Sequence, residues 1–151
     1  MSENLLGQVS IVGPDACGDG WNSAAPSDEQ AHLGAYEWHH YDANVSNGNE
    51  ETYLRNHLQT IDQSGRKPVF LGEIGAGNSD SGSVTSTYQY GLDMADYRLQ
   101  IARSGLSGAS AWCFDDNLFG TKQCGMGNVV TGSLKPWFYS WSLLARYESS
   151  W

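Results

Sequence analysis

The sequence predicts an α/β fold of four consecutive β/α units, all within one domain that spans residues 1–151. Strand-like and helix-like patterns alternate along the chain, and such alternation implies a parallel sheet with right-handed crossovers. Residues 68–75 form an apolar run interrupted only by Glu73, which is typical of a strand buried on both faces. No linker or low-complexity segment divides the 151 residues, which are enough for one core.

Each element has its own signal along the chain. The predicted strands cover residues 7–13, 34–41, 68–75 and 108–114. The predicted helices cover residues 49–64, 84–104 and 133–147, and a weak helical turn is expected near residues 27–32. A long loop rich in glycine and asparagine joins the last strand to the last helix.

The helix boundaries follow from capping chemistry. Asn49 can cap the first long helix, and two glutamates follow it in the positive first turn. The 84–104 pattern carries apolar residues at alternating steps of four and three, and Gly105 ends it. Pro136 suits the first turn of the last helix.

The composition excludes several classes of partner. A net charge of −9 and a pI of about 4.6 argue against nucleic acid or an anionic membrane surface. No apolar stretch is long enough to span a membrane, and no charged-then-apolar leader opens the chain. Six tryptophans and eight tyrosines are many for this length, and their flat faces suit sugar rings. The composition therefore favours a neutral carbohydrate ligand.

The three cysteines leave the cellular compartment open. Cys17, Cys113 and Cys124 make neither a disulfide framework nor a metal-binding spacing. At most one pair can close, and Cys113 with Cys124 is the pair nearer in sequence. Free, half-buried thiols are the favoured interpretation. The sequence predicts no metal ion and no cofactor.

Polar and aromatic residues gather at the carboxyl ends of the predicted strands. Five of them are expected at one rim of the sheet: Asp15, His39, Tyr41, Glu73 and Trp112. Side-chain alternation gives His39 and Tyr41 a common face, and it does the same for Ser110 and Trp112. A purely structural sheet does not require four strands that end in this way.

Alternation also orients the third strand. It places Val69, Leu71 and Glu73 on one face of that strand. Phe70 and Ile74 then point toward the helices. In a β/α barrel the carboxyl end of each strand faces the active site, so Glu73 is the first candidate for chemistry.

These groups suit the cleavage of a glycosidic bond. A carboxylate such as Glu73 can attack an anomeric carbon. The Tyr41 hydroxyl and the His39 ring can keep that carboxylate ionised through hydrogen bonds. Trp112 can carry the sugar ring on its flat face.

The same residues also allow a purely structural interpretation. His39 or His40 could be a hydrogen-bonded structural histidine, and the two aromatic residues could be part of the core. Asp15 could cap the loop that follows it. Glu37 shares a face with His39 and lies deeper, so it is interpreted as a buried, paired structural acid.

In order and spacing, these motifs resemble the C-terminal half of the retaining glycoside hydrolases with a (β/α)8 barrel, the cellulase, mannanase and β-xylosidase-like superfamily. The resemblance covers nearly the whole chain. The matching segments are Gly13-Pro14-Asp15, His39-His40-Tyr41, residues 69–73, Ala111-Trp112 and residues 134–139. It implies that Glu73 is the nucleophile, flanked by His39 and Tyr41. It also implies that Trp112 lies under the cleaved sugar, and we expect His40 and Asp15 to be further substrate contacts.

The chain departs from that superfamily in one large respect. The superfamily places its general acid/base in an Asn-Glu motif at the end of the fourth barrel strand. This chain contains no such motif and no counterpart of the first four strands, so it corresponds to half a barrel. A retaining mechanism needs two carboxyl groups about 5–5.5 Å apart. The sequence offers only one clear candidate, and a weak glycosidase is therefore expected.

A four-stranded sheet with an apolar inner face needs cover. Two copies could close an eight-stranded barrel, a separate N-terminal half could complete it, or the sheet could flatten into a flavodoxin-like layer. The homodimer is the favoured prediction. The alternative function is a non-catalytic carbohydrate-binding or assembly fragment.

Overall fold

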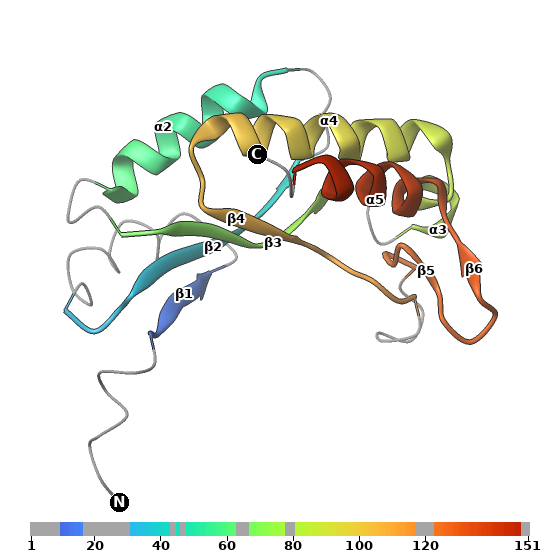
Figure 1. Cartoon of the computed structure of the whole chain (residues 1–151), viewed down its shortest axis with the longest axis horizontal. Coiled ribbons are helices and arrows are strands. Elements are labelled where there is room, and N and C mark those ends of the chain that lie inside the picture. The colour runs from blue at the N-terminus through green and yellow to red at the C-terminus, as the bar shows by residue number, and fades with distance from the viewer. Residues whose placement is uncertain are drawn as a thin grey trace, which may run out of the picture.

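The fold is an α/β layer in which helices cover one face of a parallel sheet. The computed structural model describes residues 10–16, 31–42, 45, 48–62, 67–77, 81–116 and 123–148. Figure 1 shows the long helices α2, α4 and α5 on the same side of the sheet. None of the helices among these residues is long and apolar enough to cross a membrane.

The sheet has four described strands, all parallel, in the order β1-β2-β3-β4. They are β1 (Val12–Ala16), β2 (Ala35–Asp42), β3 (Val69–Ala76) and β4 (Gly108–Ala111). The predicted parallel sheet is thus confirmed, and the second and third strands begin and end within one residue of their predicted bounds. The first strand lies later than predicted, although residues 7–9 are outside the described part. The fourth ends at Ala111, three residues earlier than predicted.

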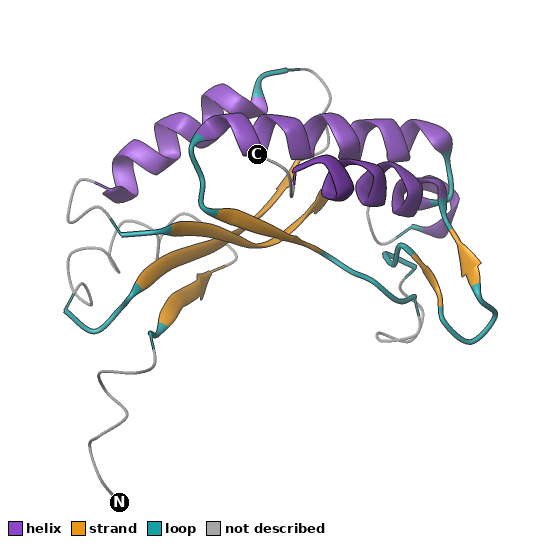
Figure 2. Cartoon of the chain, viewed as in Figure 1, coloured by secondary structure: helices purple, strands orange, loops and turns teal. Residues whose placement is uncertain are grey.

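The helices alternate with the strands, as the sequence predicts. They are α2 (Glu50–Asp62), α3 (Gly82–Thr85), α4 (Tyr88–Ser104) and α5 (Pro136–Glu148). Figure 2 shows that the face of the sheet opposite α2, α4 and α5 carries no helix among the described residues. Most of the turn expected near residues 27–32 lies outside the described residues.

The prediction of one continuous helix over residues 84–104 is wrong. The chain breaks between α3 and α4, where Thr87 adopts an extended conformation with φ −87° and ψ 151°. Its side-chain oxygen accepts a hydrogen bond from the backbone N–H of Tyr90 at 3.1 Å, and this cap starts α4. Gly105 ends α4 in the left-handed region with φ 94°, as predicted.

The loop after β4 contains a short hairpin that the sequence analysis did not predict. Its strands are β5 (Gly127–Asn128) and β6 (Ser133–Leu134), which pair antiparallel. Ser133 therefore belongs to β6 and not to the last helix, which begins at Pro136. The Lys135 ammonium anchors this region by donating to Asp116 Oδ1 at 2.7 Å and to the Gln123 carbonyl at 2.7 Å.

The core lies between the sheet and the helices. It contains large side chains that are almost fully buried, among them Tyr36, Trp38, Leu54, Leu71, Ile74, Met94, Tyr97 and Trp137. These residues come from β2, β3, α2, α4 and α5, so the helical layer is fastened to one face of the sheet only. Burial of this apolar surface is the main favourable contribution to folding.

A bulge at Gly72 reverses the side-chain pattern of β3. Trp38 is the partner of Leu71 and His39 is the partner of Glu73, so β3 has one residue more than β2 at this point. As a result Leu71 and Ile74 both lie in the core, while Glu73 lines the other face. The predicted common face of Val69, Leu71 and Glu73 is therefore wrong, and so is the helix-facing position of Phe70. The prediction for Ile74 is confirmed.

Candidate active site

The open face of the sheet carries a hollow of about 580 Å³. All four described strands or the residues next to them contribute to its lining. The residues that matter for chemistry are Asp15, Glu37, His39, Glu73 and Trp112. Five of the six residues expected at the site therefore lie at or beside one hollow, since Tyr41 reaches Glu73 from the same face.

Glu73 is held by two neighbours from β2. The Tyr41 hydroxyl donates a hydrogen bond to Glu73 Oε2 at 2.8 Å. Nδ1 of His39 lies 3.4 Å from the same oxygen. The Glu73 side chain remains 24% exposed, so one side of the carboxylate is open to the hollow. Both contacts come from residues that sequence alternation had placed on one face.

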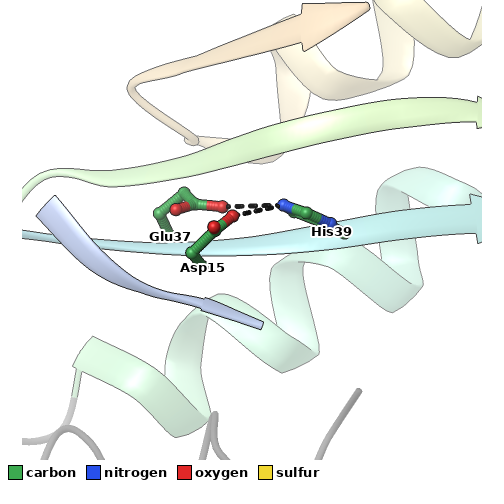
Figure 3. A group of neighbouring side chains, drawn as sticks. All are labelled: Asp15, Glu37 and His39. Atoms are coloured by element: carbon green, nitrogen blue, oxygen red, sulfur yellow. Dashed lines mark hydrogen bonds and ion pairs between the residues drawn. The ribbon is translucent and has the colours of Figure 1, made fainter. Parts of the chain in front are cut away.

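The imidazole of His39 is surrounded by carboxylates. Its Nε2 lies 2.7 Å from Asp15 Oδ1 and 3.3 Å from Glu37 Oε1. Figure 3 shows the three side chains converging from β1 and β2 on one point. With Glu73 at the other ring nitrogen, one imidazole contacts three acidic side chains.

Glu37 lies deepest in this group. Its side chain is 11% exposed and rests over β3 where Gly72 lacks a side chain. Burial raises the pKa of the Glu37 carboxyl above its usual value, the negative charge of Asp15 adds to this, and nearby His39 opposes it. Glu37 Oε1 has no hydrogen-bond partner among the described residues. The sequence favours a structural role for Glu37 and leaves a catalytic role as the alternative, and the face that it shares with His39 is the signal that places it here.

Asp15 and Trp112 lie at opposite edges of the hollow. Asp15 has a positive φ of 59° and an exposed side chain that contacts His39, while the loop that it was expected to cap lies outside the described residues. Trp112 follows the end of β4, and its backbone N–H donates to the Ile74 carbonyl at 2.9 Å. The half-buried Trp112 thus lines the same hollow as Glu73.

His40 is not brought to the hollow. It points to the helical side of β2, where its Nε2 lies 2.7 Å from Glu50 Oε2. Its ring stacks on Tyr53 of α2 with centroids 4.6 Å apart. Because Glu50 is itself buried, this pair fastens α2 to the sheet. The expected contact between His40 and substrate therefore has no support in the geometry.

Two cysteines, one of which follows Trp112 in the sequence, lie close together in the fold. Cys113 and Cys124 are both buried, and their sulfur atoms are in contact at 2.7 Å. Both are free thiols in this structure, as the favoured interpretation had it, but they are more deeply buried than expected. Burial raises the pKa of the Cys113 thiol to about 12. Cys17 lies outside the described residues.

Comparisons with known proteins support the fold. No protein-family model matches this chain, and no curated protein sequence matches it. A GH39 β-xylosidase from Caulobacter crescentus superimposes with a TM-score of 0.67 at 16% identity, over 95% of this chain and 34% of that one. A monomeric β-xylosidase from Caulobacter crescentus CB15 gives a TM-score of 0.73 at 14% identity, over the same shares.

At such low identity the likeness concerns the fold alone. The two solved structures are β-xylosidases, and this chain shares part of their fold; its parallel β/α arrangement is consistent with part of a (β/α)8 barrel. The chain spans about a third of the length of the two solved structures that it matches, since it covers 34% of each.

Proposed function

We propose that this chain is a glycoside hydrolase that acts on β-linked sugars, with Glu73 as the nucleophile. One observation carries the proposal: Glu73 faces the hollow with one oxygen held by Tyr41 and His39. A carboxylate fixed in this way at the carboxyl end of a strand can attack an anomeric carbon and form a glycosyl-enzyme intermediate.

The neighbouring residues have distinct roles in this proposal. The Tyr41 hydroxyl favours the ionised form of Glu73, because it donates a hydrogen bond to the carboxylate. Asp15 orients the His39 ring through Nε2, so that Nδ1 stays directed at Glu73. Trp112 supplies a flat surface on which the sugar ring can stack.

A second carboxyl group that could protonate the leaving group is harder to identify in this site. Among the described residues that line the hollow, the other acids are Asp15 and Glu37, and both contact His39. Neither is free to protonate a leaving group while it holds that ring. We therefore propose weak activity for the chain alone.

We further propose that a second copy of the chain completes the barrel and covers the hollow. Among the described strands, β1 and β4 form the two edges of the sheet, and both run in the same direction. Two such sheets related by a two-fold axis place β1 of one copy beside β4 of the other, and eight parallel strands then close.

The direct test is to replace Glu73 by glutamine and to measure hydrolysis of nitrophenyl glycosides. β-Xylosides are included because both superimposed structures are β-xylosidases. We expect Glu73→Gln to remove the activity and to leave the circular dichroism spectrum and melting temperature unchanged. Glu51→Gln on α2 is the matched control and should retain full activity, because Glu51 pairs with Arg55 and Arg103 away from the hollow. Activity that survives in Glu73→Gln would contradict the assignment.

A second candidate function is a non-catalytic sugar-binding or assembly fragment. It is favoured by the short span of the chain relative to the two glycosidases. In that case no glycoside would be hydrolysed, yet Trp112 fluorescence should still respond to sugars. Both wild type and Glu73→Gln would then give the same titration curve.

A further inference from the structure

We propose that the hollow binds a divalent transition cation of the zinc class through Asp15 Oδ1, Glu37 Oε1 and His39 Nε2. The three ligand atoms all lie within 4.8 Å of one another and come from β1 and β2 (Figure 3). A tetrahedral zinc ion with bonds of 2.0–2.2 Å separates its ligand atoms by roughly 3.3 Å. The separation of 3.3 Å between His39 Nε2 and Glu37 Oε1 already has this value. His39 Nε2 and Asp15 Oδ1 are hydrogen-bonded at 2.7 Å, so the exposed Asp15 side chain must move outward when the ion binds.

An independent observation points into the same site. Glu37 is 9% exposed, and its Oε1 is buried without a hydrogen-bond partner among the described residues. A buried carboxylate oxygen is costly unless it is paired or coordinates a metal. This oxygen is aimed at the space beside His39 Nε2, where the cation would lie.

The local charge also favours a cation. Asp15, Glu37 and Glu73 surround one imidazole, and the described residues that line the hollow include no lysine or arginine. A divalent ion would offset the surplus negative charge that the three acids create.

The other ring nitrogen of His39, Nδ1, also has the kind of neighbour that is usual for a metal-binding histidine. Coordination through Nε2 leaves the ring proton on Nδ1, and Nδ1 lies 3.4 Å from Glu73 Oε2. Histidines that bind a metal almost always donate their other N–H to a carboxylate or carbonyl, which fixes the ring. Glu73 would thus orient the ligand without binding the ion.

The donor set indicates which ions fit. One imidazole nitrogen with two carboxylate oxygens suits zinc or manganese, whereas magnesium and calcium prefer oxygen alone. Three protein ligands also leave a coordination position open toward the hollow. The metal site shares Asp15 and His39 with the proposed glycosidase site, but metal binding is measured without any sugar.

The experiment is isothermal titration calorimetry of chelator-treated protein with Zn²⁺ and, in parallel, with Mg²⁺. We expect Zn²⁺ to bind and Mg²⁺ not to bind. Asp15→Asn and Glu37→Gln should each weaken Zn²⁺ binding by about 10–100-fold. The Asp15 side chain is exposed, so its replacement leaves the fold intact. His32→Ala is the matched control, because His32 is exposed and does not line the hollow, and it should bind Zn²⁺ as wild type does.

Co²⁺ absorption spectra distinguish this site from the buried cysteine pair. We expect a Co²⁺ complex without a thiolate charge-transfer band, since neither Cys113 nor Cys124 belongs to the site. A thiolate band, no binding of Zn²⁺, or unchanged affinity in both carboxylate variants would each overturn the proposal. Glu73→Gln should weaken Zn²⁺ binding by about 10–100-fold, because it alters the carboxylate that orients the His39 ring. Wild-type Zn²⁺ binding is measured without sugar, so a failed glycosidase assay and a failed metal titration are independent results.

Discussion

Glu37 is the most deeply buried of the three acidic residues around His39. Its carboxyl group is nearly buried and lies close to two other acids, Asp15 and Glu73. Burial and these charges raise the pKa of Glu37, so the native state binds its proton more tightly than the unfolded state does. The group therefore contributes most to stability at low pH, and the contribution is lost as the pH rises through the raised native pKa.

The neutral isostere Glu37→Gln tests this linkage. In the presence of a chelator, we expect the variant to melt a few degrees above wild type at pH 7, because it removes a charge that is costly to bury. The difference should shrink as the pH falls below about 4.3, where the unfolded glutamate is also protonated. Glu51→Gln should show no such gain, since Glu51 is paired with arginines. A variant less stable than wild type at pH 7 would mean that the Glu37 charge is fully compensated.

Because both other acids of the hollow contact His39, the site should cleave best those substrates whose leaving group needs no proton. A nitrophenolate leaves without needing a proton, whereas a sugar alcohol does need one. General acid catalysis is typically worth about 10²–10⁴-fold. We expect nitrophenyl glycosides to be cleaved faster than the matching natural disaccharides by a factor of this order. Both rates are measured on one preparation, and equal, high rates on both classes would show that a competent acid exists.

Side-chain alternation predicted a large part of the site but not all of it. It gave His39 and Tyr41 a common face, whereas Glu73 joins them because it lies at the carboxyl end of the neighbouring strand and the bulge at Gly72 turns it to the hollow. Successive residues of a strand face opposite sides, so the adjacent His39 and His40 could not both face the hollow. His40 pairs with Glu50 on the helical side instead.

At the scale of single elements, β3 depends on the small size of Gly72. A Cβ atom at this position would lie 2.0 Å from Glu37 Oε1 and 2.8 Å from Glu37 Cγ. Both distances are too short for non-bonded atoms, so a side chain at residue 72 and the present position of Glu37 exclude each other. The bulge thus does two things: it turns Glu73 to the hollow and makes room for Glu37.

A double-mutant cycle tests this dependence. Gly72→Ala alone should destabilise the protein by about 1–3 kcal/mol, as expected when a packed site is overfilled. Adding Glu37→Ala removes the three atoms that lie nearest the new methyl group, so the double variant should recover part of the loss. Chemical denaturation of the four proteins gives the coupling free energy. Additive effects, with no recovery, would show that the two residues do not share this space.

The elements that the sequence failed to predict are those with weak or local signals. The break before α4 depends on the Thr87 cap, and apolar periodicity continues across it. The hairpin has two residues in each strand, too few to show alternation. The bulge in β3 depends on one additional residue, which no periodic pattern reveals.

At the scale of the whole molecule, the fold is one-sided. Helices cover one face, and the other exposes apolar surface at its edge, where the Val12 side chain is 47% exposed and lines the hollow. Exposed apolar surface of this kind, next to strand edges that no other described strand pairs with, favours association. The four β/α units were predictable from alternation, but alternation cannot identify what covers the open face.

The proposed homodimer has a direct test. Light scattering at micromolar concentration should give twice the chain mass of 16.5 kDa. Val12→Asp on β1 should shift the mass toward the monomer, because it places a charge at the interface edge. Val130→Asp is the matched control, since Val130 is 80% exposed in the turn between β5 and β6, and it should leave the dimer intact. A soluble, folded wild-type monomer would refute the pairing and favour completion by other chain segments.

The additional residue in β3 links the orientation of Glu73 to the length of the strand. Leu71 and Glu73 lie opposite the successive residues Trp38 and His39, so a strand without Gly72 would alternate regularly and Glu73 would still face the hollow. Deletion of Gly72 is therefore a different kind of change from a substitution at the same position. A side chain at residue 72 overfills the space that Glu37 occupies, whereas the deletion removes the bulge and keeps the two faces of the strand end, and mutational scans that include deletions should find loss of this residue better tolerated than a large side chain there.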